Sequence, residues 1–126
     1  MKRHAYQYVT LRCVPRVDRE EFLNVGVVLY SQSADVLDAC TALDPARLTA
    51  FAPELDVDGV TAALAIVADV CAGVEGGGRP VLGPLGRRFG WLSAPRSTIL
   101  QPSPVHSGLT DDPRGELEAL CRRLVG

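Results

Sequence analysis

The sequence predicts an α+β domain in which an antiparallel sheet of about four strands carries its helices on one face. Short segments rich in Val and aromatic residues fill the first third of the chain, which is typical of strands. Apolar residues then recur at helical spacing in the middle of the chain and again at its end. The connections between the first strand-like segments are short, and short connections join antiparallel strands.

Composition is consistent with one domain spanning residues 1–126, since 126 residues of which 47% are hydrophobic can bury a core without metal or disulfides. Thirteen basic and 15 acidic residues leave a net charge of −2, which argues against nucleic acid and anionic membranes as partners. The charged N-terminus is followed by no apolar stretch, and no apolar run reaches the ~18 residues that span a bilayer. We therefore expect a cytoplasmic protein.

The first predicted strand is Ala5 to Val14, ended by Pro15. The central one is the Val-rich run from Phe22 to Tyr30, which is too short for an ordinary helix and reads as a strand buried on both faces. Within it, Gly26 predicts a bulge or the close approach of another backbone. A third strand, residues 36–42, completes a meander.

Helices are predicted from cap chemistry and periodicity. Asp44 followed by Pro45 begins a helix that ends near residue 52. A longer helix starts at Asp56 or Asp58 and continues to about residue 72, and it should cover one face of the sheet. Asp112 with the following proline starts the last helix, whose apolar residues form one stripe.

The remaining segments carry weaker signals. Residues 73–90 contain many glycines and predict a flexible loop, which lacks the ending of a phosphate-binding loop. Residues 97–100 predict a fourth strand, followed by an extended path that two prolines enforce.

The four cysteines at positions 13, 40, 71 and 121 are too far apart in sequence for a metal knuckle or a redox dithiol. Because they fall mostly within apolar patterns, we expect small buried thiols of a reducing compartment. No His, Asp, Glu or Cys cluster has metal-ligand spacing, so no metal and no cofactor is predicted.

The stretch from Arg87 to Leu109 is the chemically densest part of the chain. It combines arginines, the one tryptophan, a histidine and several serines on a backbone stiffened by prolines. Guanidinium groups beside hydroxyls suit phosphate or carboxylate, and Trp91 can stack on a base or an arginine. His106 has the pKa range of a general acid or base.

A structural interpretation of the same stretch stays open. Trp91 and Phe89 can be core aromatics, and Arg96 can pair internally with Glu20 or Glu21 while the prolines close the sheet.

Four segments of the chain resemble a bacterial family catalogued as domain of unknown function 3037. The similar segments are residues 6–8, 21–30, 88–97 and 101–109. The resemblance implies a gene neighbourhood shared with a HipA-type kinase-like protein, and so a role as its accessory. It also draws attention to the polar and special residues of these segments, namely Asn24, Gly26, Trp91, Arg96, Ser97, Gln101, Ser103 and His106.

We therefore expect a non-enzymatic accessory protein that binds a HipA-type kinase-like partner or an anionic small molecule. The candidate binding residues are Asn24, Arg88, Trp91, Arg96, Ser97, Gln101, Ser103 and His106. The alternative is a small enzyme acting on a phosphate- or carboxylate-bearing substrate, with nucleic acid among the candidates, in which His106 is the acid/base and Arg96 stabilises the anion. Both expectations assume that the late segment, from Trp91 to His106, folds beside the Val-rich strand. It would then bring the indole, the Arg96 guanidinium and the imidazole to one open site.

Overall fold

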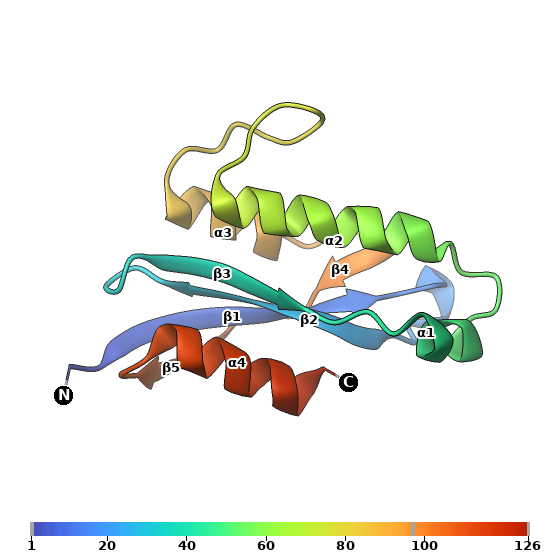
Figure 1. Ribbon diagram of the computed structural model, residues 1–126, viewed down its shortest axis with the longest axis horizontal. Helices are drawn as coiled ribbons and strands as arrows, with labels where there is room; N and C mark the ends of the chain where they lie inside the picture. Colours follow the sequence, from blue (N-terminus) through green and yellow to red (C-terminus); the bar gives the residue numbers. More distant parts are fainter. Residues whose placement is uncertain (1, 97, 126) are drawn as a thin grey trace.

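The computed structural model describes residues 2–96 and 98–125. Five antiparallel strands form one sheet that is sandwiched between helices (Figure 1). The elements in chain order are β1 (His4–Cys13), η1 (Val17–Arg19), β2 (Leu23–Ser31), β3 (Val36–Thr41), α1 (Pro45–Phe51), α2 (Val57–Ala72), α3 (Leu85–Ser93), β4 (Leu100–Pro102), β5 (His106–Thr110) and α4 (Pro113–Leu124). The α+β class is confirmed, with five strands in place of about four.

The predicted meander is confirmed, because β1 pairs with β2 and β2 with β3, all antiparallel. The strand that organises the sheet is nevertheless β1, which pairs with β2 along one edge and with both β4 and β5 along the other. The late segment therefore folds beside β1, and the expectation that it lies beside the Val-rich β2 is wrong. β5 was not predicted at all, since its residues carry little strand propensity.

Gly26 fulfils both expectations stated for it. The register between β1 and β2 shifts at this point, with Leu11 opposite Gly26 and Arg12 opposite Asn24. A Cβ at Gly26 would also lie 3.0 Å from the Cys40 carbonyl oxygen of β3. The missing side chain thus permits a bulge and a close strand contact at the same residue.

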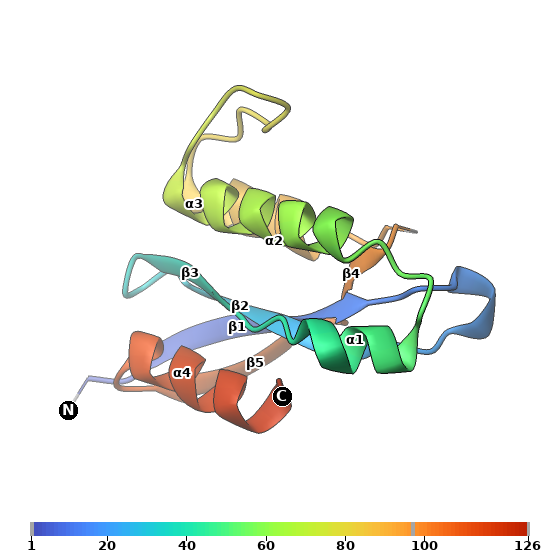
Figure 2. The ribbon, with the colours of Figure 1, turned by 45° about the vertical axis from the view of Figure 1, so that its right-hand side comes forward.

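Helices cover both faces of the sheet, which differs from the predicted single face (Figures 1 and 2). α2 and α3 pack on one face, in a core that includes Val28 of β2. α4 packs on the other face, in a second core that includes Val27 and Leu29. Neighbouring β2 residues point to opposite faces, so a strand apolar at every position needs a cover on each side. α4 supplies the second cover, which explains why the middle of β2, residues 25–29, is buried without interruption.

The predicted helix starts are confirmed at atomic detail. Asp44 accepts hydrogen bonds from the backbone amides of residues 46 and 47, Asp56 from residue 59 and Asp112 from residue 115. Each carboxylate satisfies amides that have no partner inside the helix, which is why Asp in this position begins a helix. No helix in the described part of the chain is long and apolar enough to cross a membrane.

The Gly-rich segment is more ordered than predicted, because its last third, residues 85–90, belongs to α3. Its first half is tied to α2 by Arg79, whose guanidinium lies 2.6 Å from the Asp69 carboxylate. Phe89 and Leu92 of α3 are buried against the sheet. Two glycines inside α3 weaken its helical signal, and the packing of these apolar residues outweighs that cost.

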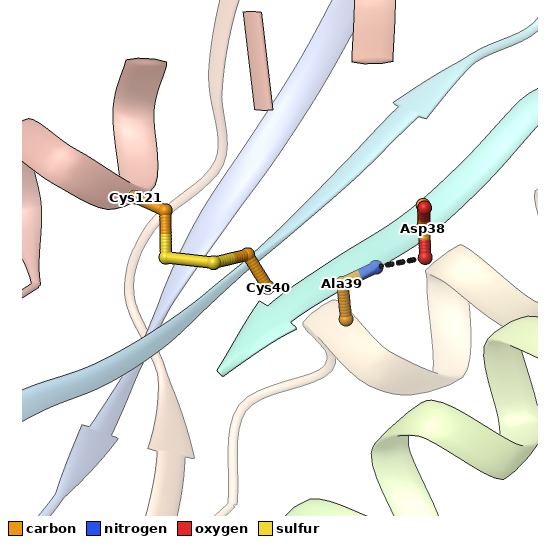
Figure 3. Close-up of a disulfide and its surroundings, with 4 residues drawn as sticks. All are labelled: Asp38, Ala39, Cys40 and Cys121. Carbon is orange, nitrogen blue, oxygen red and sulfur yellow. Dashed lines mark hydrogen bonds between the residues drawn. A yellow bond between two sulfur atoms is a disulfide. The ribbon is translucent and has the colours of Figure 1, made fainter. Parts of the chain in front are cut away.

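Cys40 of β3 and Cys121 of α4 form a disulfide across 81 residues of sequence (Figure 3). The expectation of four separate thiols is therefore wrong for this pair and confirmed for Cys13 and Cys71, which are free and buried. Partners so far apart in sequence leave no spacing signal. Only the position of α4 on the outer face of β3 brings the two sulfur atoms together.

Candidate functional site

Arg88 of α3 caps the C-terminal end of α2. Its Nε donates to the carbonyl of Gly83 at 2.8 Å, and its Nη1 donates to the carbonyl of Cys71 at 3.0 Å. The last carbonyls of a helix lack intrahelical partners and carry partial negative charge, so a guanidinium stabilises them. The predicted binding arginine thus has a structural role in joining α2, the Gly-rich segment and α3.

Trp91 and Arg96 form one unit at the end of α3. The Arg96 guanidinium carbon lies 4.6 Å from the centre of the Trp91 ring, in a cation–π contact. Arg96 also donates to the carbonyls of Trp91 and Ala94. The predicted pairing of Arg96 with Glu20 or Glu21 is wrong, since Glu21 pairs with Arg19. The arginine is nonetheless held internally, as the structural interpretation expected.

Ser103 is buried and joins β4 to β1. Its hydroxyl accepts from the Thr10 amide at 2.9 Å and donates to the Pro104 carbonyl at 2.9 Å, while its own amide donates to the Thr10 carbonyl. A buried hydroxyl that makes two hydrogen bonds stabilises the corner of the sheet and is not positioned as a nucleophile. Ser97, another predicted site residue, lies outside the described residues.

Asn24 and Gln101 lie on either side of Arg12 across three strands. Asn24 of β2 and Gln101 of β4 are both direct cross-strand partners of Arg12, so the three side chains share the α4 face of the sheet. Asn24 donates to the Leu124 carbonyl at 3.0 Å, and its Oδ1 is buried without a hydrogen-bond partner in the described structure. We call Asn24, Arg12 and Gln101 the polar row.

Arg12 is the member of the polar row that sequence reasoning missed. Its Nε is buried and, within residues 2–96 and 98–125, has no hydrogen-bond acceptor, and no carboxylate pairs with its guanidinium. The guanidinium carbon stacks 4.2 Å from the centre of the Phe22 ring. A half-buried cation without a counter-ion attracts an anion. Its position in the strand alternation was visible in the sequence, but its lack of a partner was not.

His106 is exposed and lies on β5 directly opposite Tyr8 of β1, with ring centres 5.1 Å apart and an angle of 24° between the planes. Tyr6 continues this stack, and its ring lies across Gly108. We call Tyr6, Tyr8 and His106 the aromatic ledge. Burial and the nearby Glu116 carboxylate raise the pKa of Tyr6, so the phenol stays protonated and available as a donor.

The structure does not bring the predicted site together. Trp91 packs on the core of the α2 face, whereas Tyr8 and its partner His106 belong to the α4 face. The sheet separates the imidazole from the indole and from the Arg96 guanidinium stacked on it. The predicted open site shared by these three groups does not exist, because β4 and β5 contact different parts of β1.

A cavity of about 540 Å³ lies between the β1–β2 connection and the α1–α2 connection. Its apolar wall includes Phe51, Leu55 and Ile99. Its arginines, Arg16 and Arg19, are each paired with a neighbouring carboxylate, so the cavity offers no unpaired cation. Of the sequence-predicted site residues that the structure describes, none lines this cavity. In the described part of the chain, no group of three His, Cys, Asp or Glu residues could hold a metal ion.

The family model described as "Protein of unknown function (DUF3037)" matches residues 8–125. The chain belongs to this family. No curated protein and no solved structure matches the chain. In this DUF3037 protein, the match runs from Tyr8 in β1 to the end of α4, and so contains the polar row, the Tyr8–His106 pair and both cysteines of the disulfide.

Proposed function

We propose that this DUF3037 protein is a non-enzymatic accessory protein that binds a HipA-type kinase-like protein. The supporting observation is which candidate residues make internal contacts and which remain exposed. Arg88, Arg96 and Ser103 are engaged in internal hydrogen bonds, whereas His106 of the aromatic ledge remains exposed. Aromatic side chains on a rigid, partly exposed surface are typical of protein interfaces.

The enzymatic alternative gains no support from the geometry. It required His106 as acid/base within reach of a substrate anion held by Arg96, and these residues belong to opposite faces of the sheet.

Co-purification tests the accessory role. A tagged chain should retain the kinase-like protein when the two are co-expressed, and His106→Ala should reduce the retained amount at least about fivefold, as loss of an interface anchor does. Arg87→Ala is the matched control, because Arg87 is exposed on α3 and away from the ledge. Retention that is unchanged by His106→Ala would remove the ledge from the interface. No retention of the wild-type partner would overturn the proposal.

A second function, binding of an anionic small molecule, is favoured by one observation. The Arg12 guanidinium is half-buried beside Asn24 and Gln101 with no carboxylate partner in the described structure. A phosphate or carboxylate group would accept from Arg12, and a hydroxyl or amide on the same ligand would donate to Asn24 Oδ1.

Thermal shift and calorimetry with inorganic phosphate, citrate and nucleoside monophosphates test this second function. A ligand at about ten times its Kd raises the unfolding free energy by about 1.4 kcal/mol, and Arg12→Gln should abolish that gain. Arg122→Gln, an exposed arginine in the last turn of α4, is the control and should leave it intact. No stabilisation by any of these anions would exclude them as ligands of the polar row.

We also keep the cytoplasm as the proposed location, and the disulfide offers a test of it. The cytoplasm keeps most thiols reduced. Acid quenching of intact cells, followed by alkylation of the denatured chain and mass measurement, should then add label to Cys40 and Cys121 as well as to the two free cysteines. Persistent protection of Cys40 and Cys121 would argue for an oxidising compartment.

A further inference from the structure

The sheet has exposed edges at β3, β4 and β5, and two of them are blocked. At β3, the Ala39 amide donates to the carboxylate of Asp38 at 2.8 Å (Figure 3), and the same carboxylate lies 2.9 Å from the Arg114 guanidinium of α4. A charge held at the edge in this way discourages another strand from adding. β4 is three residues long and ends at Pro102, which has no amide to donate.

The β5 edge carries no such block. β5 pairs with β1 alone among the strands, and within the described chain none of the backbone hydrogen bonds outside the helices and sheet ladders involves residues 105–109. Leu109 is 60% exposed and Val105, just before the strand, is 46% exposed. No Asp, Glu, Lys or Arg lies between these two residues. Uncharged edges with exposed apolar side chains are the ones to which extended chains add.

Side-chain contacts hold this edge in place. His106 stacks on Tyr8, Tyr6 lies across Gly108, and Ser103 fixes the preceding corner to Thr10 through hydrogen bonds. A strand that is already ordered loses little entropy when a further strand pairs with it. The open edge is therefore also a preorganised one.

We propose that β5 is a strand-addition site that takes an extended segment of a partner protein, and this rests on the accessory role proposed above. The incoming segment would hydrogen-bond to the β5 backbone. Its alternate side chains would meet Leu109 on one face and His106 on the other, which selects an apolar residue for the first position and an aromatic or aliphatic one for the second.

The size of the edge decides between a peptide segment and a second copy of the chain. β5 has five residues and is roughly 17 Å long. A stable dimer interface needs about 800 Å² from each partner, which is more than two such strands supply by pairing alone. Peptide strands of similar length bind through backbone hydrogen bonds and a few side-chain contacts.

Hydrogen exchange with the kinase-like protein as the probe tests the site directly. In the complex, amides within residues 105–109 should exchange at least about tenfold more slowly, while β3 amides keep their rates. Leu109→Lys with Val105→Lys places charge on the edge and should weaken binding at least about tenfold. Val81→Lys is the matched control, because Val81 is 76% exposed and lies in the Gly-rich segment. Thermal unfolding confirms that each variant is folded.

The outcomes separate this inference from the accessory role. A complex that forms with no change in β5 exchange, or that survives both lysine substitutions, overturns the strand-addition site and leaves the accessory role standing. A failure of the wild-type chain to bind overturns both. A doubled mass of the chain in solution that reverts to the monomer with Leu109→Lys identifies the occupant as a second copy and also overturns the proposal.

Discussion

At the scale of single residues, Gly26 shows how the absence of a side chain permits close strand packing. A Cβ there would lie 3.0 Å from a backbone oxygen of Cys40 and 3.2 Å from Leu11. Neither the backbone nor the buried leucine can move away at little cost. The Cβ would therefore push β3 away from β2.

Gly26→Ala should lower the unfolding free energy by about 1–3 kcal/mol, the usual cost of overpacking a core. Gly90→Ala is the matched control, because Gly90 is inside α3 and, apart from its chain neighbours and the surrounding helix backbone, no described atom lies within 4 Å of the added Cβ. That substitution should stabilise the protein by about 0.5–1 kcal/mol through helix propensity. Urea unfolding of both variants measures the difference, and equal effects would contradict the packing argument.

Cys71 is a second residue whose environment has a measurable consequence. Burial raises the pKa of its thiol from 9.0 to about 12, and the Asp38 carboxylate adds to the shift. Above pH 9 the unfolded chain releases this proton while the folded chain keeps it. The contribution to stability is therefore complete below pH 9 and is lost as the pH rises towards 12.

Urea unfolding between pH 8 and pH 10.5 should show the stability falling less steeply for Cys71→Val than for the wild type. Valine keeps the site apolar and of similar size, so it removes the titration with little change in packing. A slope identical to that of the wild type would show that the thiol does not contribute. Burial also raises the pKa of Cys13. Because this thiol is present in both proteins, it makes the same contribution to the pH dependence of stability in each.

At the scale of elements, the contact between Arg96 and Trp91 stabilises the C-terminal end of α3. Arg96 stacks on Trp91 and donates to two carbonyls of the final turn, which lack helical partners. α3 contains two glycines and no capping side chain at its start, so it depends on its buried residues and on this arginine.

Arg96→Ala should lower the unfolding free energy by about 1–2 kcal/mol and speed amide exchange in α3. Arg96→Lys should restore little of this, because a single ammonium cannot both stack on the indole and reach two carbonyls. Arg87→Ala, on the same helix but exposed, serves as the control and should change stability by less than about 0.5 kcal/mol. Equal stability of the Arg96 and Arg87 variants would contradict the structural role.

At the scale of the whole molecule, two cores share one sheet, and α4 closes the second. Val27 and Leu29 of β2, together with Leu117 and Leu120 of α4, form this smaller core. The Cys40–Cys121 bridge adds a covalent link between β3 and the same helix. The closed loop spans 81 residues, so the bridge lowers the conformational entropy of the unfolded chain.

Reduction should therefore lower the unfolding free energy by up to about 4.5 kcal/mol, the loop-closure value for a bridge of this span. The measurement is urea unfolding with and without dithiothreitol. A Cys40→Ser, Cys121→Ser double variant is the control, since the reductant should not change its stability. If the wild type and the double variant respond alike to the reductant, the bridge does not form in solution.

Much of the fold was predictable because its signals are local. Asp44, Asp56 and Asp112 cap helices through amides two or three residues away, and this chemistry is visible in a short window. The site was less predictable. The sequence predicts Arg96 and Ser103 as binding residues because guanidinium and hydroxyl groups donate hydrogen bonds to anions. Only the tertiary structure shows that both donate to carbonyl groups within the protein.

The sequence by itself determined the α+β class, the β1–β2–β3 meander, the bulge at Gly26 and the starts of three helices. Each depends on side-chain periodicity or on contacts within a few residues. The tertiary structure decided that α4 takes the second face, that β4 and β5 pair with β1, and that Cys40 meets Cys121. These contacts join segments distant in sequence, so no local pattern encodes them. The cover by α4 follows from the apolar residues that β2 presents on both faces of the sheet.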